Sequence, residues 1–147
     1  MKKEQEKPEL KFEEVYVDAN LLIYAATEEG AISKKAFEIV EKIKQGHYKA
    51  FTSILTMDEV LYIIQKNAGR EIAAKTVETY LKLNNLNIIS VDMQILNKSI
   101  EIYKKTSLRP RDSIHLAAMQ LNEIKTIISQ DSDFDKIKDI KRLDFSK

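Results

Sequence analysis

The sequence predicts an α/β fold, a three-layer α/β/α sandwich around a central parallel sheet of four or five strands. Short runs of β-branched and aromatic residues alternate with segments that have the apolar spacing of helices. One or two helices separate consecutive strands, which requires crossover connections and therefore parallel strands covered on both faces. A length of 147 residues, 44% of them hydrophobic, is enough for one packed core and too short for two ordinary domains.

The chain begins with a charged segment that has no apolar period. Residues 1–13 contain Pro8 among many charged side chains, which predicts an N-terminal tail. Residues 14–147 are expected to form a single domain. Its first strand is predicted at residues 15–17, VYV, which end at Asp18, and a helix is expected to begin near Leu21.

The next segments predict a helix, a strand and two further helices. Apolar residues recur at helical spacing from Ser33, and Gly46 is placed to end that helix. Residues 49–52, KAFT, predict the second strand. The length and composition of residues 54–67 favour a helix over a strand. The apolar residues of the two outer helices are Ala36, Phe37, Val40 and Ile43, and then Ile72, Ala73, Val77, Tyr80 and Leu81.

The second half of the chain continues the alternation. Residues 87–91 predict the third strand, and Asp92 can cap the helix that follows it. Residues 110–121 begin with a proline, which suits the first position of a helix. Residues 126–129 predict the fourth strand, and a short fifth is expected within 140–143. The helix after Asp92 carries the apolar residues Met93, Leu96, Ile100 and Tyr103.

The composition excludes several classes of site. The chain has no cysteine and two histidines, so it cannot build a structural zinc site of the usual sulfur and nitrogen type, and any metal must be held mainly by oxygen. Its three glycines are isolated from one another, which excludes a P-loop and a dinucleotide-binding glycine motif. A net charge of +1 gives no general attraction to nucleic acid, so such a partner would need a local basic patch.

The sequence also predicts a location and an absence of membrane contact. The longest apolar run, residues 21–26, is far shorter than the roughly twenty residues needed to cross a bilayer. The charged N-terminal segment lacks the features of a secretory signal. Together with the absence of cysteine, this predicts a soluble cytoplasmic protein.

Acidic residues distant in sequence are expected to meet at one edge of the sheet. Asp18 ends the first strand, Glu59 lies early in the helix after the second, and Asp131 follows the fourth, with Asp133 two residues beyond it. Asp112, in the first turn of its helix, should lie near the same edge. Ligand sites in such sheets form outside the carboxyl ends of the strands. Clustered carboxylates are stable only if cations bind or if their pKa values rise, and the convergence points to hard metal ions such as Mg²⁺ or Mn²⁺.

Each acid also has a structural interpretation. Asp18 could cap the first helix, Asp112 complements a helix dipole, and the aspartates from Asp131 onward could form a solvated turn. Asp58 competes with Glu59, and helical periodicity leaves open which of the two faces inward. Of the two histidines, we expect His115, one turn after Asp112, to be packed or supporting, and His47 to lie on the surface.

Two other carboxylate-based sites do not fit the spacing. Asp131, Asp133 and Asp135 have the alternate spacing of a calcium loop, but Lys136 stands where its glycine belongs and Arg142 where its glutamate belongs. A phosphatase of the haloacid dehalogenase type needs a second aspartate two residues after the first-strand acid. Here that position is an asparagine.

Four segments in order resemble the PIN domain family (PilT N-terminus-like and VapC-like ribonucleases) across about residues 14 to 134. They are VDANLLIY around Asp18, TSILTMDEV around Glu59, RPRDSIHLAAM around Asp112 and ISQDSDF around Asp131. By the family's pattern Glu59, not Asp58, is the second acid, and Asp131 is favoured over Asp133 because it is nearer the strand end. The polar positions that line such a site match Asn20, Thr52, Ser53 and Ser129.

The resemblance implies a Mg²⁺- or Mn²⁺-dependent endoribonuclease with one or two ions in each site. It further implies an RNA substrate, a homodimer, and either an antitoxin partner or a partner in RNA processing. A non-catalytic PIN scaffold in RNA processing or ribosome assembly is the alternative. The implied catalytic residues are Asp18, Glu59, Asp112 and Asp131, and the implied metal ligands are these four together with Asp133.

Overall fold

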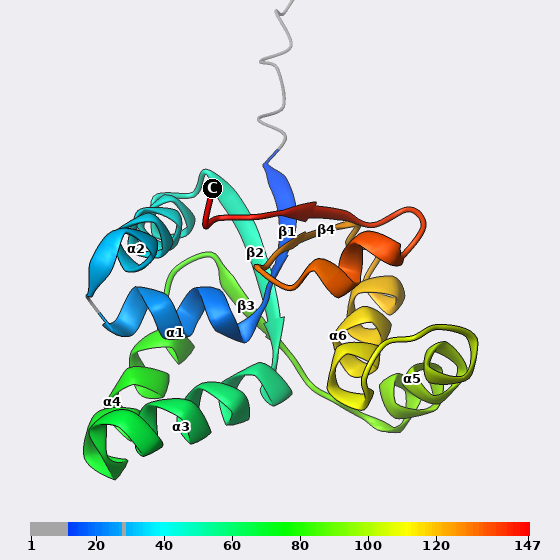
Figure 1. Cartoon of the computed structure of the whole chain (residues 1–147), viewed down its shortest axis with the longest axis horizontal. Helices are drawn as coiled ribbons and strands as arrows, with labels where there is room; N and C mark the ends of the chain where they lie inside the picture. Colours follow the sequence, from blue (N-terminus) through cyan, green and yellow to red (C-terminus); the bar gives the residue numbers. More distant parts are fainter. Residues whose placement is uncertain (1–11, 28) are drawn as a thin grey trace, which may run out of the picture.

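Five parallel strands form the central sheet of a computed structural model that describes residues 12–27 and 29–147 (Figure 1). The predicted tail lies outside these residues except for its last two, and Glu13 already belongs to the first strand. The sheet order is β3-β2-β1-β4-β5. The strands are β1 (Glu13–Val17), β2 (Tyr48–Ser53), β3 (Leu86–Ile89), β4 (Thr126–Ile128) and β5 (Lys141–Leu143).

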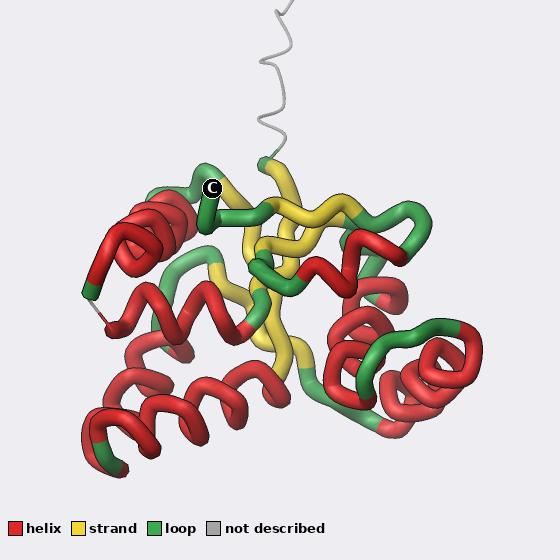
Figure 2. The backbone as a smooth tube through the Cα atoms, in the orientation of Figure 1, coloured by secondary structure: helices red, strands yellow, loops and turns green. Residues whose placement is uncertain are grey.

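Helices connect the strands and cover both faces of the sheet, so that the strands lie between them in Figure 2. Within the described residues, none of the helices combines the length and apolar character needed to cross a membrane. The helices are α1 (Ala19–Thr27), α2 (Gly30–Lys44), α3 (Ile54–Ala68), α4 (Arg70–Leu81), α5 (Met93–Lys105) and α6 (Pro110–Leu121), with a short 3-10 helix, η1 (Ser132–Lys136).

The two faces of the sheet bury two separate apolar cores. Successive side chains of a strand point to opposite faces, and β1 shows this directly. Val15 and Val17 pack in a core with residues of α1 to α4, whereas Tyr16 packs with residues of α5 and α6. Figure 1 shows these two groups of helices on opposite sides of the sheet. The predicted three-layer architecture is therefore confirmed.

The connectivity of the sheet creates a switch point between β1 and β4. The chain first builds outward from β1 through β2 to β3, and then returns to add β4 and β5 on the other side of β1. Such a reversal opens a crevice at the carboxyl ends of the two strands involved. Val17 pairs with Ile128, so Asp18 and Ser129 are the next residues beyond the paired strands.

Two predicted helix boundaries are confirmed by the backbone geometry. Gly46 has a φ of 86°, and the amide of His47 donates to the Lys42 carbonyl over 2.9 Å, which ends α2 as expected of a glycine in the left-handed region. Asp92 caps α5, because its Oδ1 accepts from the Ile95 amide over 2.9 Å.

The apolar stripe that marks α5 in the sequence is not the face that the helix buries. The residues that pack inward from α5 are Ile95, Ser99 and Ile102. Periodicity shows that apolar residues share a face, but it does not show which face the sheet covers when a helix has two apolar stripes. The exposed stripe consists of Met93, Leu96, Ile100 and Tyr103, which are 67%, 40%, 46% and 54% exposed.

Candidate functional site

The predicted acids lie at the carboxyl edge of the sheet, around the switch point between β1 and β4. Asp18 directly follows β1, and Asp131 follows β4 by three residues. Glu59 is in the second turn of α3, the helix that β2 enters, and Asp112 is in the first turn of α6. Asp133 lies in η1. Residues far apart in sequence are thus supplied to one edge by four separate connections.

Asp18 is fixed in place by hydrogen bonds from three neighbours. The Ser129 hydroxyl donates to its Oδ2 over 2.6 Å, and the Ala19 amide donates to its Oδ1 over 2.8 Å. The Asn20 side-chain amide is 3.4 Å from Oδ2. Asp18 itself is buried, with 6% of its surface exposed. The carboxylate therefore accepts a hydrogen bond from the first residue of α1 with one oxygen and contacts the loop after β4 with the other.

The Ser129 hydroxyl connects Asp18 to the loop that carries the last acids. It accepts a hydrogen bond from the Asp131 amide over 2.9 Å while it donates to Asp18. Oδ1 of Asp131 in turn accepts from the Asp133 amide over 2.9 Å. One buried hydroxyl group thereby ties the end of the first strand to the turn that follows the fourth.

Three carboxylates form a tight cluster beside this connection. Asp112, Asp131 and Asp133 each present an oxygen, and these oxygens all lie within 4.8 Å of one another. Asp131 and Asp133, between which the sequence left a choice, both belong to the cluster. Asp133 also has Lys136 Nζ 3.7 Å from its Oδ1. Like charges at this separation repel one another, so the cluster favours either a cation or proton uptake.

The acids act on one another's titration. The pKa of Asp112 is raised to about 6, first by burial and then by the negative charges of Asp131, Asp18 and Glu59, while His115 opposes the shift. Burial also raises the pKa of Asp18, although His115 and the hydrogen bond from Ser129 oppose this shift. The predicted acids therefore share one electrostatic environment.

Glu59 is held by a hydrogen bond with His115, a buried histidine of α6. Its Oε1 is 2.7 Å from Nε2 of His115, whereas the competing Asp58 is exposed. Nδ1 of His115 lies 2.7 Å from the Tyr16 hydroxyl. Burial lowers the pKa of His115, but Tyr16, Glu59 and Asp18 outweigh burial and raise that pKa to about 10. Sequence reasoning placed His115 near Asp112 but gave Tyr16 no role, because a tyrosine inside a buried strand looks like any other core residue.

A second residue that sequence reasoning missed is Arg142 of β5. Its guanidinium donates to both carboxylate oxygens of Asp135 over 2.8 Å and to the Ser129 carbonyl over 3.2 Å. Nη1 is also 3.3 Å from Asp144. These contacts brace the 129–135 loop against the edge strand. An arginine in a short edge strand carries no signal in the sequence that would reveal this role.

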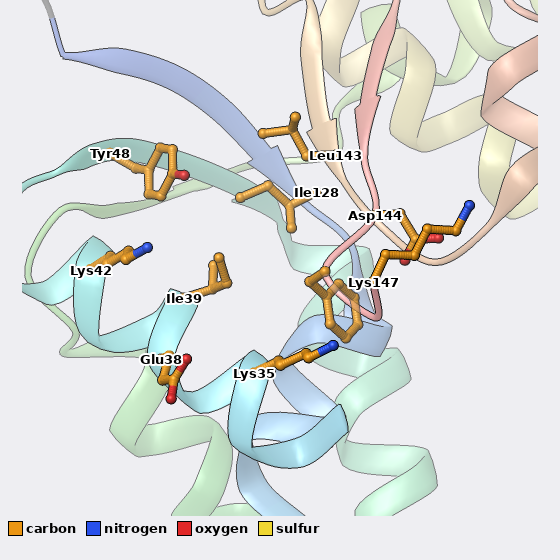
Figure 3. A pocket seen from close by; sticks show the side chains of 10 residues that line it. Lys35, Glu38, Ile39, Lys42, Tyr48, Ile128, Leu143, Asp144 and Lys147 are labelled. Atoms are coloured by element: carbon orange, nitrogen blue, oxygen red, sulfur yellow. The ribbon is translucent and has the colours of Figure 1, made fainter. Parts of the chain in front are cut away.

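A hollow of about 420 Å³ lies elsewhere, between α2 and the C-terminal segment. Figure 3 shows Tyr48, Ile128 and Leu143 on its sheet side and residues of α2 opposite them. Three lysines stand around it. None of the predicted acids lines this hollow, so it is separate from the acidic cluster. Its lining residues are Lys35, Glu38, Ile39, Lys42, Tyr48, Ile128, Leu143, Asp144, Phe145 and Lys147.

The structure is a three-layer α/β domain with an acidic edge, and comparison with known families gives its class. The PIN domain family model matches residues 15–140, which is most of the chain. The chain therefore belongs to the PIN domain family, as the four sequence segments predicted.

Individual relatives agree with this assignment. Ribonuclease VapC2 of Methanocaldococcus jannaschii is 29% identical over an alignment of 150 positions, which covers 92% of this chain and 94% of the relative. Mycobacterium tuberculosis VapC20, described as a sarcin-ricin loop cleaving toxin, has a TM-score of 0.68 at 14% identity over 82% of this chain and 92% of that one. A toxin-antitoxin complex from Klebsiella pneumoniae has a TM-score of 0.64 at 22% identity, covering 86% of this chain and 94% of that one. The two solved structures share the fold of this chain.

Proposed function

We propose that the protein is a metal-dependent endoribonuclease that hydrolyses RNA phosphodiester bonds. The observation that supports this proposal most directly is the convergence of carboxylate oxygens from Asp112, Asp131 and Asp133 within 4.8 Å, with the buried Asp18 linked to the same loop through the Ser129 hydroxyl. The relative VapC2 carries the name ribonuclease and aligns with nearly the whole chain. The catalytic residues in this proposal are Asp18, Glu59, Asp112 and Asp131.

The donor atoms of the site fit Mg²⁺ or Mn²⁺. The clustered side chains offer only carboxylate oxygen, which these hard cations prefer, and water can complete the coordination. Asp112, Asp131 and Asp133 would hold one or two ions most directly. Asp18 and Glu59 would complete the set of carboxylate ligands. When bound, such ions neutralise charge at the phosphate and lower the pKa of a bound water.

The protein's own groups position the substrate and the water. His115 is not available as a general base, because one ring nitrogen contacts Glu59 and the other contacts Tyr16. The orientation of the attacking water therefore falls to the carboxylates. Arg109 and Arg111 are exposed immediately before Asp112 and are our candidates for contacts to RNA phosphates.

We further propose that the protein forms a homodimer and binds either an antitoxin or a partner in RNA processing. The exposed apolar stripe of α5 supports the homodimer, because contiguous apolar surface on a folded domain marks interaction sites. The antitoxin proposal has support from the Klebsiella structure, because the chain that shares this fold belongs to a toxin-antitoxin complex.

The test is cleavage of single-stranded RNA by the purified protein with Mg²⁺ or Mn²⁺. Wild type should cleave, EDTA should stop the reaction, and Asp112→Asn should reduce it to background, because asparagine keeps the size but removes the charge that holds the ions. Calorimetry should show weaker Mn²⁺ binding by Asp18→Asn than by wild type. Asp58→Asn is the matched control, since Asp58 is an exposed acid on the same helix as Glu59.

Two outcomes would contradict the proposal. Cleavage that survives EDTA or the Asp112→Asn substitution would exclude the carboxylate-metal assignment. A folded protein that binds partners but shows no metal-dependent cleavage would be a non-catalytic PIN scaffold.

A further inference from the structure

We propose that Tyr16 and His115 are positioning residues that hold the Glu59 carboxylate at the acidic site. This inference rests on the proposed nuclease function, in which Glu59 is one of the working acids. The three residues form a continuous hydrogen-bonded chain that runs from the middle of the sheet to the carboxyl edge, with 2.7 Å between Tyr16 Oη and His115 Nδ1 and 2.7 Å between His115 Nε2 and Glu59 Oε1.

The chain is assembled from three separate elements, which gives it a fixed frame. Tyr16 comes from β1, His115 from α6 and Glu59 from α3. Tyr16 is 0% exposed and His115 is 1% exposed, and their rings meet edge to face with centroids 5.5 Å apart. Burial and a hydrogen bond at each ring nitrogen of His115 restrict the movement of the imidazole. The hydrogen bond to Glu59 therefore comes from a donor that is itself held in place.

The direction of the hydrogen bonds is set by the chemistry of the two ends. A carboxylate can only accept, so Nε2 of His115 must carry the proton and donate to Glu59. The Tyr16 hydroxyl can donate to an unprotonated Nδ1 or accept from a protonated one. Tyr16 thus serves the neutral ring and the charged ring equally, and in both cases Nε2–H remains directed at Glu59.

Glu59 needs such a restraint because its neighbours repel it. Its negative charge raises the pKa values of both Asp18 and Asp112, which places it within the field of those acids. Its side chain is 21% exposed, so rotation toward solvent would relieve that repulsion. Among residues 12–27 and 29–147, His115 supplies the hydrogen bond to its carboxylate, on Oε1. The other oxygen, Oε2, is then left for the site.

The Tyr16 hydroxyl has a specific use in this arrangement. A phenylalanine would fill the same buried space between the sheet and α6, so packing alone gives no reason for a hydroxyl at 0% exposure. The contact that the hydroxyl makes is with His115. Removing it leaves Nδ1 of a buried ring without a partner and takes away one of the two hydrogen bonds that orient the imidazole, so that the ring holds Glu59 less firmly.

The experiment compares single-turnover RNA cleavage by Tyr16→Phe, His115→Phe, His115→Gln and Glu59→Gln. Tyr16→Phe should lower kcat about tenfold with little change in KM, the range typical when a partner that orients a ligand residue is lost. His115→Phe should lower it as far as Glu59→Gln does. His115→Gln should recover most of the activity, since its amide can donate to Glu59 and accept from Tyr16.

The double variant His115→Phe with Glu59→Gln separates a positioning role from a purely structural one. If His115 acts through Glu59, the double variant should be no slower than Glu59→Gln alone. Multiplied losses in the double variant, or wild-type kcat in both Tyr16→Phe and His115→Phe, would overturn the inference. Thermal unfolding of each variant identifies any that fail to fold, and Tyr16→Phe is the substitution least disruptive to packing.

A readout that does not depend on RNA cleavage distinguishes the inference from the proposed function. The ¹³C resonance of the Glu59 carboxyl group should shift in Tyr16→Phe and His115→Phe and return in His115→Gln. An unchanged resonance in the first two variants would overturn the positioning role even if the wild type is active. If the wild type shows no metal-dependent cleavage but the resonance shifts as expected, the proposed function fails and the positioning of Glu59 stands.

Discussion

At the scale of single residues, the acidic site should lower the free energy of unfolding of the metal-free protein by a measurable amount. Asp112 has a pKa of about 6 when folded, against an ordinary value of 3.8. Its carboxyl group binds a proton more tightly in the folded state than in the unfolded state. The metal-free fold is therefore destabilised by this group above pH 6, and the destabilisation disappears as the pH falls toward 4.

Asp112→Asn should accordingly stabilise the metal-free domain at pH 7.5. Because Asp112 is only half-buried, solvent screening reduces the gain to roughly 1 kcal/mol in the free energy of unfolding, or about 2–4 °C in Tm. Thermal unfolding in EDTA measures the gain, and the difference between variant and wild type should close near pH 4. Asp58→Asn should show little of this effect. A less stable Asp112→Asn at pH 7.5 would mean that the clustered charges do not strain the fold.

The residues that sequence reasoning could place are those fixed by strand ends. Asp18 and Asp131 follow from the rule that sites form at the carboxyl ends of parallel strands. Whether Glu59 or Asp58 turns inward depends on a contact with His115, which is 56 residues away in the chain. Tyr16 was missed for a related reason: alternation along a strand shows that a residue is buried, but not that its hydroxyl meets a histidine.

At the scale of secondary-structure elements, the local capping signals and the buried faces of α2 and α4 were predicted correctly, whereas the buried face of α5 was not. Gly46 acts through its backbone conformation and Asp92 through its side chain, each within a few residues, so the sequence alone was enough to find them. The inward face of α5 depends on how the helix packs against α6, which is a tertiary contact that periodicity along the sequence does not encode. The more strongly apolar stripe of α5 was therefore a misleading guide to its core.

The cap of α5 gives a prediction for stability without loss of function. Asp92→Ala removes the side chain that accepts from the Ile95 amide, and should lower the free energy of unfolding by about 1 kcal/mol. Urea denaturation measures this loss. RNA cleavage at a temperature where both proteins are folded should be unchanged, since Asp92 is outside the acidic cluster. Asp92→Ser should recover most of the stability, and equal stability of wild type and alanine variant would argue against the cap.

At the scale of the whole molecule, the exposed stripe of α5 predicts how copies of the chain associate. Ile100→Glu places a charge in the middle of this stripe and should weaken the proposed homodimer at least tenfold, an order of magnitude expected for a central interface residue. Analytical ultracentrifugation over a range of concentrations measures the dissociation constant.

The matched control is Ile72→Glu, because Ile72 is similarly exposed but lies on α4, on the opposite side of the molecule from α5 (Figure 1). This variant should associate as the wild type does. Equal weakening by both substitutions would indicate that the dimer uses another surface, and a wild type that stays monomeric at every concentration would exclude the homodimer.

The hydrogen bond from the Ser129 hydroxyl to Asp18 joins residues 111 positions apart in the chain, and this determines when the acidic site can form. The first acid is synthesised early, but the loop that fixes it against the cluster is near the end of the chain. Contacts of such long sequence separation form late in folding because the intervening loop must close first. A chain still being synthesised on the ribosome therefore lacks the assembled acidic site until β4 has docked beside β1.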